Sequence, residues 1–492
     1  MIEALAAARD RSAIAPAVLE VIARQNARWG ASTNRRDRLD ALRRGAVAIV
    51  TGQQLGLGLG PLYTVHKAAS AIRIAQALEA EGVPAVPIFW LHSEDHDFEE
   101  IRSLSWPAEG VVHTASLPER PSARARTSIA HEKVGPGIDA VLAALEGSPF
   151  AARMKAHYLP DASLSDAFGS LLAELFAPFG LLTFDPRNEE IAALAAPLHA
   201  RALQEHDALS ASLVERVAAI ESAGGKAPIP IRAECTLSFF HPEGPEGPRY
   251  RMIPSADGIS LSGAPETFSR AEIAQRLERE PLCFSTSALL RPVLQDHLLP
   301  TAAYVGGPSE VAYAAQLAPI YETLGVTAAP FVRRASFVVT SPRDREDLAA
   351  LSLDVARLAE PEDTLVRGLG RVPVTEEIES LARSVATSIA AMQSALEALD
   401  PGLAKTAAKT EATIAQSFDK LRSRAERAAA TRDPQRLMRL RRVLASLRPG
   451  GAPQERVLGL PAIAELDLDR VAEALVAHAL DRPLGTEVEL AL

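Results

Sequence analysis

Two short apolar segments constrain the fold of this 492-residue chain more than any other feature. Residues 46–50 are wholly apolar and lead into a glycine-rich segment, and residues 83–90 form a second apolar run. Such runs, bounded by glycine, are typical of strands buried on both faces of a sheet. Between them, residues 63–81 carry apolar side chains at helical spacing and stop at Gly82. The order strand, helix, strand predicts a right-handed βαβ unit and hence a parallel sheet.

The rest of the chain divides into regions of different pattern. Residues 1–45 are expected to be helical, and further strands are expected at residues 181–185, 302–305 and 326–336. Mixed sequence at about 105–160 and expected hairpins at about 224–280 form two insertions. Long helical periodicity at about 346–450 predicts an antiparallel arm or coiled coil. We therefore expect an α/β core of residues 1–345, the arm at 346–450, and a closing segment of residues 451–492 packed on the core.

Composition excludes several classes of protein. The net charge of −10 provides no basic field for nucleic acid or an anionic membrane. Two cysteines, Cys235 and Cys283, are too few for a disulfide framework or a four-cysteine zinc site, and they fit a reducing cytosol. No stretch is apolar over about 20 residues, and no apolar signal core is visible. We expect a cytoplasmic protein that binds neither nucleic acid nor a membrane.

The glycine-rich segment after the first expected strand is a candidate anion site. A loop between a buried strand and a helix exposes N–H groups that favour phosphate or carboxylate. The segment has neither a Walker sequence nor the Gly-x-Gly-x-x-Gly of nicotinamide-binding folds. Gln53 and Gln54 offer polar groups, and His66 and Lys67 lie about one helical turn further on. A purely structural loop fits the pattern equally well.

Ionisable side chains crowd the end of the second expected strand, from His92 to Glu100. Ligands of open α/β sheets bind outside the carboxyl ends of the strands. Crowded carboxylates and histidines shift each other's pKa, which favours a poised acid or base. His92, Asp95 and His96 also provide ligand types suited to a divalent metal. The alternative is a solvated acidic loop that caps the next helix.

Two later segments carry weaker signals. Residues 290–296 and a glycine turn at residues 306–310 surround another expected strand, and Ser309 and Glu310 occupy helix-capping positions. Arg333 and Arg334 lie near the end of the last expected strand, where they either hold a phosphate or are solvated.

These segments together resemble the BshC family, the cysteine-adding enzymes of bacillithiol biosynthesis. The resemblance rests on residues 50–56, 60–68 and 89–100, with support from residues 290–292, 299–301, 306–310 and 454–456. It implies a Rossmann-like core of the class I nucleotidyltransferase type with two connecting-peptide insertions. It also implies a C-terminal α-helical coiled coil and a homodimer formed through that coil.

The resemblance implies a ligase that adds L-cysteine to the amine of glucosaminyl-malate in the last step of bacillithiol biosynthesis. An amide does not form from a carboxylate and an amine without activation, so ATP/ADP is the expected cofactor, with ATP forming either an acyl-adenylate or an acyl-phosphate. Two alternatives remain open on the sequence. One is an adenylating or nucleotidyl-transferring enzyme that acts on another amino acid or sugar acceptor, and the other is a non-catalytic dimeric scaffold.

The resemblance also suggests roles for individual residues. The expected catalytic residues are Asp95, His96, His66 and Glu94, with Asp95 and His96 orienting the amine and taking its proton. The expected substrate-binding residues are Gln53, Gln54, Tyr63, Lys67, Ser93, Asp97, Arg291 and Gln295. The expected nucleotide-binding residues are Gly306, Gly307, Glu310, Arg333, Gln454 and Arg456. No metal ligand is assigned.

Overall fold

The computed structural model describes residues 1–7 and 12–492. Residues 8–11, part of the stretch 1–45 predicted to be helical, lie outside the described residues. The described part of that stretch forms α1 (Ile2–Ala7), α2 (Pro16–Arg28) and α3 (Thr33–Arg43). The chain divides into two compact units. The first unit contains Met1–Trp106, Thr114–Val338 and Glu455–Leu490, and the second contains Pro107–His113, Val339–Gln454 and Ala491–Leu492.

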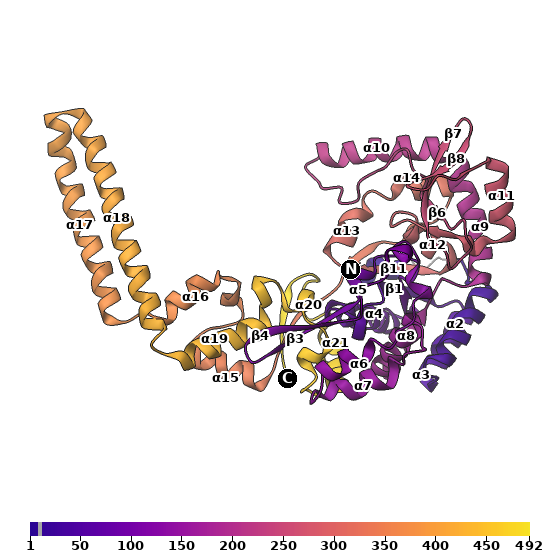
Figure 1. Ribbon diagram of the computed structural model, residues 1–492, viewed down its shortest axis with the longest axis horizontal. Coiled ribbons are helices and arrows are strands. Elements are labelled where there is room, and N and C mark those ends of the chain that lie inside the picture. Colours follow the sequence, from indigo (N-terminus) through magenta and orange to yellow (C-terminus); the bar gives the residue numbers. More distant parts are fainter. Residues whose placement is uncertain (8–11) are drawn as a thin grey trace. The chain divides into compact units, whose positions relative to one another are not determined.

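A parallel sheet of five strands forms the core of the first unit, in the order β12-β11-β1-β2-β5. Two of its strands, β1 and β11, are labelled in Figure 1. Its strands are β1 (Val47–Gln53), β2 (Ala85–Leu91), β5 (Leu182–Phe184), β11 (Thr301–Gly306) and β12 (Phe331–Arg333). Helix α4 (Tyr63–Ala80) connects β1 to β2, so the predicted βαβ unit and parallel sheet are confirmed. Strands β2 and β5, which follow β1 in the sequence, lie on one side of β1, and the later strands β11 and β12 lie on the other side. The strand order therefore reverses between β1 and β11, which is where open α/β sheets bind ligands.

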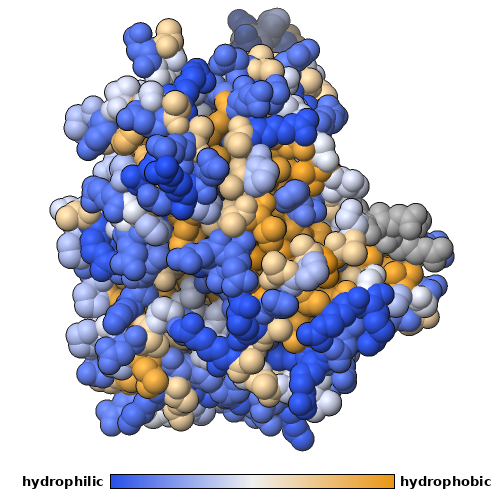
Figure 2. Space-filling view, turned by 90° about the vertical axis from the view of Figure 1, so that its right-hand side faces the viewer, coloured by the Kyte–Doolittle hydropathy of each residue, from blue (hydrophilic) through white to orange (hydrophobic). Residues whose placement is uncertain are grey.

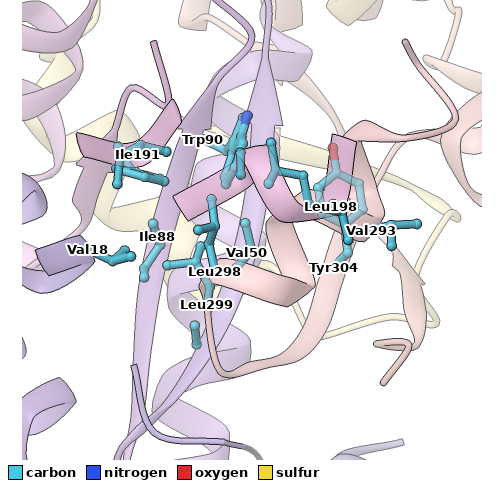
Figure 3. Close-up of a cluster of buried hydrophobic side chains, with 14 of the residues drawn as sticks. Val18, Val50, Ile88, Trp90, Ile191, Leu198, Val293, Leu298, Leu299 and Tyr304 are labelled. Atoms are coloured by element: carbon cyan, nitrogen blue, oxygen red, sulfur yellow. The ribbon is translucent and has the colours of Figure 1, made fainter. Parts of the chain in front are cut away.

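Burial on both faces explains why the apolar runs form central strands. In register, Val50 of β1 lies between Ile88 of β2 and Tyr304 of β11. These side chains join Trp90 and Leu198 in one buried cluster, shown in Figure 3. On the opposite face, Ile49 packs in a second cluster with apolar residues of α4.

Helices cover the sheet and connect its strands. They are α5 (Phe98–Ile101), α6 (Ile138–Ala144), α7 (Pro149–His157), α8 (Leu164–Phe176), α9 (Glu189–Gln204), α10 (His206–Ser222), α11 (Arg270–Arg279), α12 (Arg291–Leu298), α13 (Pro308–Ala314), α14 (Ala318–Leu324) and α21 (Leu468–His478). Helix α21 packs against α4, which brings the end of the chain onto the core unit. Two small sheets pair β3 (Ser103–Ala108) with β4 (Val111–Ser116), and β13 (Ser336–Thr340) with β14 (Glu487–Ala491).

An antiparallel sheet forms in the region where hairpins were predicted. Its order is β10-β6-β7-β8-β9, with β6 (Ser238–Phe240), β7 (Tyr250–Ser255), β8 (Gly258–Leu261), β9 (Thr267–Phe268) and β10 (Phe284–Thr286). The first of these strands begins at Ser238 instead of near residue 224. Pro228 and Pro230 lack the N–H that a strand needs for its ladder, which accounts for the later start.

The second unit is helical, as its periodicity predicts. It contains α15 (Pro342–Leu351), α16 (Glu362–Leu369), α17 (Pro373–Leu399), α18 (Pro401–Ala430) and α19 (Pro434–Leu447). Helices α17 and α18 lie side by side as a long antiparallel pair, joined at Asp400 (Figure 1). Leu381 and Met392 on α17 remain 58% and 53% exposed.

On the face shown in Figure 2, hydrophilic side chains surround an irregular band of hydrophobic ones. No helix within residues 1–7 and 12–492 combines the length and apolar character needed to cross a membrane.

Candidate active site

A cavity of about 570 Å³ opens at the carboxyl ends of β1, β2 and β11 in the first unit. This is the reversal point of the strand order, and the volume suits a small-molecule ligand. Most of the residues that line it are polar or charged. The lining residues are Gln53, Gln54, Tyr63, Lys67, Trp90, Leu91, His92, Glu94, Asp95, His96, Glu100, Phe239, Arg249, Arg251, Thr286, Ser287, Ala288, Arg291, Gly307, Pro308, Ser309, Glu310, Tyr313, Arg334 and Arg456.

The end of β1 must be glycine because His92 packs against it. A Cβ atom at Gly52 would lie 2.6 Å from the Trp90 carbonyl oxygen and 2.7 Å from His92 Nε2. Burial, followed by the charge of Arg291, lowers the pKa of His92 well below its usual value. The imidazole is therefore neutral near pH 7. Its Nε2 is buried and has no hydrogen-bond partner among the described residues.

The ammonium group of Lys67 binds other groups of the protein. Its Nζ donates to the Gly52 carbonyl and to Gln53 Oε1, each at 2.9 Å, and pairs with Glu310 Oε2 at 2.5 Å. Burial would raise the pKa of Glu310, but the Lys67 charge and hydrogen bonds outweigh it and lower the pKa to about 2. An ammonium has three hydrogens. The three contacts therefore account for all of them, and Lys67 ties the end of β1 to the start of α13.

The glycine-rich segment turns its donors away from the cavity. Residues 55–60 are buried and do not line the cavity. The N–H groups of Gly56, Gly58 and Gly60 donate to the Gln54 carbonyl, the Tyr158 hydroxyl and the Leu57 carbonyl. An anion in the cavity consequently meets side-chain guanidinium groups. The anion site that the sequence predicted from the backbone N–H groups of this loop does not form.

Glu455 organises a buried group of charges behind the cavity. It accepts two hydrogen bonds from Arg334, both at 2.6 Å, one from His66 Nδ1 at 2.8 Å and one from Ser336 Oγ at 3.0 Å. Burial opposes ionisation of Glu455, but the hydrogen bonds from His66 and Arg334 hold its pKa well below the usual range. Arg334 lines the cavity and His66 does not. His66 therefore acts on the cavity only through Glu455 and Arg334.

Asp95 and His96 form an acid–base pair on the cavity wall. Asp95 accepts a hydrogen bond from Gln54 Nε2 at 2.7 Å, and its Oδ1 lies 3.4 Å from His96 Nδ1. Burial would raise the pKa of Asp95, but the hydrogen bond from His96 and the charge of Arg249 lower it strongly. Asp95 therefore stays ionised beside the imidazole.

Two further carboxylates near Asp95 and His96, those of Glu100 and Glu94, have different surroundings. Burial, together with the charges of Asp97 and Asp95, raises the pKa of Glu100, which also lines the cavity. Glu94 Oε2 accepts hydrogen bonds from the backbone N–H and the hydroxyl of Thr286, at 3.1 and 2.6 Å. Glu94 thereby joins the parallel sheet to the antiparallel one.

The antiparallel sheet supplies two arginines that the sequence reasoning missed. The guanidinium groups of Arg249 and Arg251 lie 3.8 and 4.7 Å from the centre of the Phe239 ring. Arg249 donates to the carbonyls of Glu94 and Thr286. The guanidinium of Arg251 has no hydrogen bond or ion pair with any residue that the structure describes, although its backbone carbonyl accepts from Ser262. Arg251 lies in β7 and Arg249 immediately precedes it. Residues two positions apart in extended backbone share a face, and this alternation was the signal that the sequence offered.

Arg291 reaches the cavity from the first turn of α12. Its Nη1 donates to Gln295 Oε1 and its Nη2 to the Tyr313 hydroxyl, each at 3.2 Å. The guanidinium also lies 5.1 Å from the centre of the Tyr304 ring. Gln295 does not line the cavity and instead orients Arg291.

The structure brings most of the predicted site residues to one cavity. Those that line it are Gln53, Gln54, Tyr63, Lys67, Glu94, Asp95, His96, Arg291, Gly307, Glu310 and Arg456. Those of the first unit that do not line it are His66, Ser93, Asp97, Gln295, Gly306 and Arg333.

The residues outside the lining have other contacts. Ser93 Oγ donates to Asp185 Oδ1 at 2.5 Å, and Asp97 caps α5 by accepting from the Glu100 N–H. Arg333 lies against Gly485, whereas its neighbour Arg334 faces the cavity. Gln454 belongs to the second unit, where its amide bonds to both backbone groups of Val339 and to the Ser446 carbonyl.

The histidines and carboxylates of the cavity are also considered as metal ligands. Within the described part of the chain, no three His, Cys, Asp or Glu side chains are placed to hold a metal ion. His92, Asp95 and His96, whose side-chain types suit a metal, do not form such a set in this structure.

Comparisons with known proteins give a consistent result. Residues 2–335 match the family model described as Bacillithiol biosynthesis BshC, N-terminal Rossmann-like domain, and residues 337–465 match its C-terminal coiled-coil domain. Relatives named cysteine ligase BshC occur in Koribacter versatilis (32% identity; 92% of this chain and 84% of the relative), Salinibacter ruber (30%; 92% and 83%) and Heliobacterium modesticaldum (31%; 89% and 83%).

Proposed function

Because the chain belongs to the BshC family of bacillithiol biosynthesis, we propose that its cavity joins the carboxylate of L-cysteine to the amine of glucosaminyl-malate. The family's relatives are named cysteine ligases, so the reaction class is formation of a carbon–nitrogen bond. The comparisons do not favour an adenylating or nucleotidyl-transferring enzyme with another acceptor. The observation that carries the proposal is a cavity that combines guanidinium groups free of protein partners with an acid–base pair.

The free guanidinium groups match the charges of the substrates. Arg251 and Arg456 line the cavity and form no ion pair with other residues in the described ranges. Guanidinium binds carboxylate and phosphate with two parallel hydrogen bonds. Arg251 binds a malate carboxylate of the acceptor, and Arg456 binds a phosphoryl group of the nucleotide.

The acid–base pair handles the proton of the attacking amine. His96 takes this proton as the amine nitrogen bonds to the cysteine carbonyl carbon, a role that imidazole fills in many enzymes. Asp95 stays ionised because its pKa is depressed, so it orients His96 and stabilises the imidazolium that forms. Glu100, whose pKa is raised, is another carboxylate on the cavity wall.

ATP supplies the activation that the cysteine carboxylate needs. A carboxylate oxygen attacks a phosphorus of ATP, which makes an acyl-phosphate with ADP as product or an acyl-adenylate with pyrophosphate as product. The amine then displaces the phosphoryl oxygen from the acyl carbon. The turn at Gly307 and the Arg456 guanidinium both line the cavity, and together they are the proposed nucleotide side of the site.

The second unit supports a homodimer in this proposal. Helices α17 and α18 pair along their length, yet Leu381 and Met392 remain exposed on α17, and Leu421 on α18 is 53% exposed. Exposed apolar side chains at helical spacing are suited to a second copy of the same helical pair.

Thiol product formation tests the proposal directly. Purified protein is incubated with L-cysteine, glucosaminyl-malate and ATP, and products are followed by mass spectrometry. We expect His96→Gln to lower the rate about 10²- to 10⁴-fold, the usual contribution of a general base. His478→Gln is the matched control, because His478 pairs with Asp481 on the surface and lies outside the cavity lining.

The same assay separates the alternatives. Release of AMP with pyrophosphate, or of ADP with phosphate, identifies the activated intermediate. Loss of product in both histidine variants would point to general damage, and a fully active His96→Gln enzyme would remove His96 from the mechanism. Absence of any thiol product with the wild-type protein would contradict the proposed function itself.

A further inference from the structure

The first unit contains a further cavity, of about 400 Å³, at the carboxyl end of β5. Its walls come from α2 and the residue after it, from the start of α8, from residues 130–131 and from the segment that follows β5. The lining residues are Val21, Arg24, Gln25, Arg28, Trp29, Ala130, His131, Ser163, Ser165, Asp166, Asp185, Arg187 and Asn188. None of them lines the cavity at the strand ends, and the proposed reaction uses none of them. We call this space the β5 cavity.

Most of the charges on the wall of the β5 cavity are already paired within the protein. Asp166 accepts a hydrogen bond from Ser163 Oγ at 2.8 Å and pairs with Arg28 of α2. The other arginine of α2, Arg24, pairs with Glu190, which lies outside the lining. Both arginines of α2 and the carboxylate of Asp166 are therefore balanced without a ligand.

Asp185, the second carboxylate of the wall, is buried and also receives its donors from the protein. Its Oδ1 accepts from Ser93 Oγ at 2.5 Å and from the backbone N–H of Arg187 at 2.9 Å. Burial raises the pKa of Asp185, and the hydroxyls of Ser93 and Ser165 oppose that shift. A cation in the β5 cavity would consequently meet no carboxylate that lacks protein donors.

Arg187 brings to this wall a positive charge that forms no ion pair with any residue in the ranges that the structure describes. Its side chain donates only to the carbonyls of Phe284 and Pro245, at 3.3 and 2.7 Å. Burial lowers the pKa of Arg187, and the charges of Glu94 and Asp185 act on it from a greater distance. A guanidinium has five N–H groups, so most of its donors remain available. Among them, Nε is buried and has no hydrogen-bond partner.

Two further buried atoms of the wall lack partners among the described residues. Ser165 is only 6% exposed, and its Oγ has no hydrogen bond of normal geometry. His131 Nε2 is buried and has none either. Burial and the charge of Arg187 lower the pKa of His131 to about 4, so the imidazole is neutral near pH 7 and donates from one ring nitrogen. The unsatisfied atoms of the β5 cavity are therefore groups that can donate, and burying a donor without an acceptor costs stability.

A purely structural role explains part of this arrangement. The two carbonyl contacts of Arg187 connect the end of β5 to the antiparallel sheet, because Phe284 is the first residue of β10. Ordered water satisfies hydroxyl and imidazole groups in many buried cavities. Water has no charge, however, so it does not balance the guanidinium of Arg187.

We propose that the β5 cavity binds a small molecule with a single carboxylate group, a short monocarboxylic acid. An ionised carboxylate only accepts hydrogen bonds, and its two oxygens match the fork of a guanidinium. One guanidinium without an ion pair favours a monoanion over a more highly charged ligand. Ser163 and Ser165 lie at the N-terminus of α8, where the helix dipole also favours negative charge. The volume lies in the range of small-molecule sites.

Hydrogen exchange of the full-length protein tests this site, with sodium acetate as the probe and sodium chloride added to keep the ionic strength constant. We expect acetate to slow exchange in peptides covering residues 126–136, 160–170 and 183–190. Ser165→Ala with Arg187→Gln should raise the acetate concentration needed for this protection at least about tenfold, because a hydroxyl donor and a charged donor are lost. Ser212→Ala with Arg44→Gln, at exposed positions outside the lining, should behave as wild type.

The location of the protected peptides separates the β5 cavity from the cavity at the strand ends. Protection by acetate confined to peptides around residues 53–67 and 92–100 would overturn the proposal, as would a double variant with the acetate dependence of wild type. Protection of the β5 peptides by phosphate but not by acetate would also overturn it, and no protection by either anion would mean that water alone fills the cavity. If the double variant does not fold, Ser165→Ala alone, which removes a single oxygen atom, should shift the acetate dependence in the same direction.

Discussion

Replacing Lys67 with methionine tests how the cavity at the strand ends is held together. Methionine keeps the length of the apolar stem but removes the ammonium group. The change leaves the Glu310 carboxylate buried without its cation, and it leaves Gln53 Oε1 and the Gly52 carbonyl without their donor. We expect a large loss of stability in the first unit and little change in the second.

The expected loss follows from the surroundings of Glu310. Its pKa lies at about 2 instead of the usual 4.5, and each pKa unit corresponds to about 1.4 kcal/mol, so ionisation of Glu310 in the folded state contributes about 3 kcal/mol. Breaking a buried ion pair by removing one partner costs about 3–5 kcal/mol. Both estimates place the cost of Lys67→Met at about 3 kcal/mol or more at pH 7.

The loss of stability caused by Lys67→Met should be smaller in acid than at pH 7, because the wild-type protein holds the pKa of Glu310 below its usual value. In the wild type, the depressed pKa gives a contribution that is present above about 4.5 and is lost as pH falls toward 2. In the variant, burial without Lys67 raises the pKa of Glu310, so the carboxyl takes up a proton at mildly acidic pH. The difference between the two proteins at pH 4.5 should therefore be smaller than at pH 7 by about 1 kcal/mol or more.

Urea denaturation followed by tryptophan fluorescence measures this cost. Trp29, Trp90 and Trp106 all lie in the first unit, so the signal reports on that unit. Lys155→Met, at an exposed position of the same unit, should stay within about 0.5 kcal/mol of wild type. Adding Glu310→Gln to Lys67→Met should recover much of the loss. A loss below about 1 kcal/mol at pH 7, or an equal loss at both pH values, would refute the reasoning.

Two further perturbations follow from the same contacts. Glu455→Gln should cost about 3–5 kcal/mol at pH 7 because Arg334 and His66 lose a buried anion. It should also lower kcat/KM, since Arg334 lines the cavity. The wild-type contribution of Glu455 is lost as pH falls below about 4.5, because its folded pKa is depressed, so the gap in urea midpoints should narrow in acid. Leu381→Glu with Met392→Glu should turn the proposed dimer into a monomer in light scattering, while Lys405→Glu at an exposed position of α18 should not.

The sequence predicted the parts of the fold that depend on neighbouring residues. The apolar runs and the helical spacing between them identify β1, α4 and β2, because burial of a central strand and of a helix face leaves a local pattern. The charged run from His92 to Glu100 likewise marks its own strand end. The helical arm is evident for the same reason.

Contacts between distant residues limited the prediction of the site. Glu94 meets Thr286 from 192 positions away, and Arg249 and Arg251 arrive on a strand of the second sheet. Lys67 looked like an anion ligand because its partner Glu310 is remote in sequence. The motif at residues 454–456 does not show which member faces the cavity, and the structure assigns Arg456 to the cavity wall and Glu455 to the support of Arg334.

The bond between Glu455 and Arg334 also fixes an order of events during synthesis. The two residues are 121 positions apart, and nearly all of the helical unit lies between them. A ribosome that has just made β12 has delivered Arg334 but must still translate the whole arm before Glu455 emerges. The nascent core therefore carries an uncompensated guanidinium during that interval, and the cavity at the strand ends is completed only after Glu455 and the segment that follows it join the first unit.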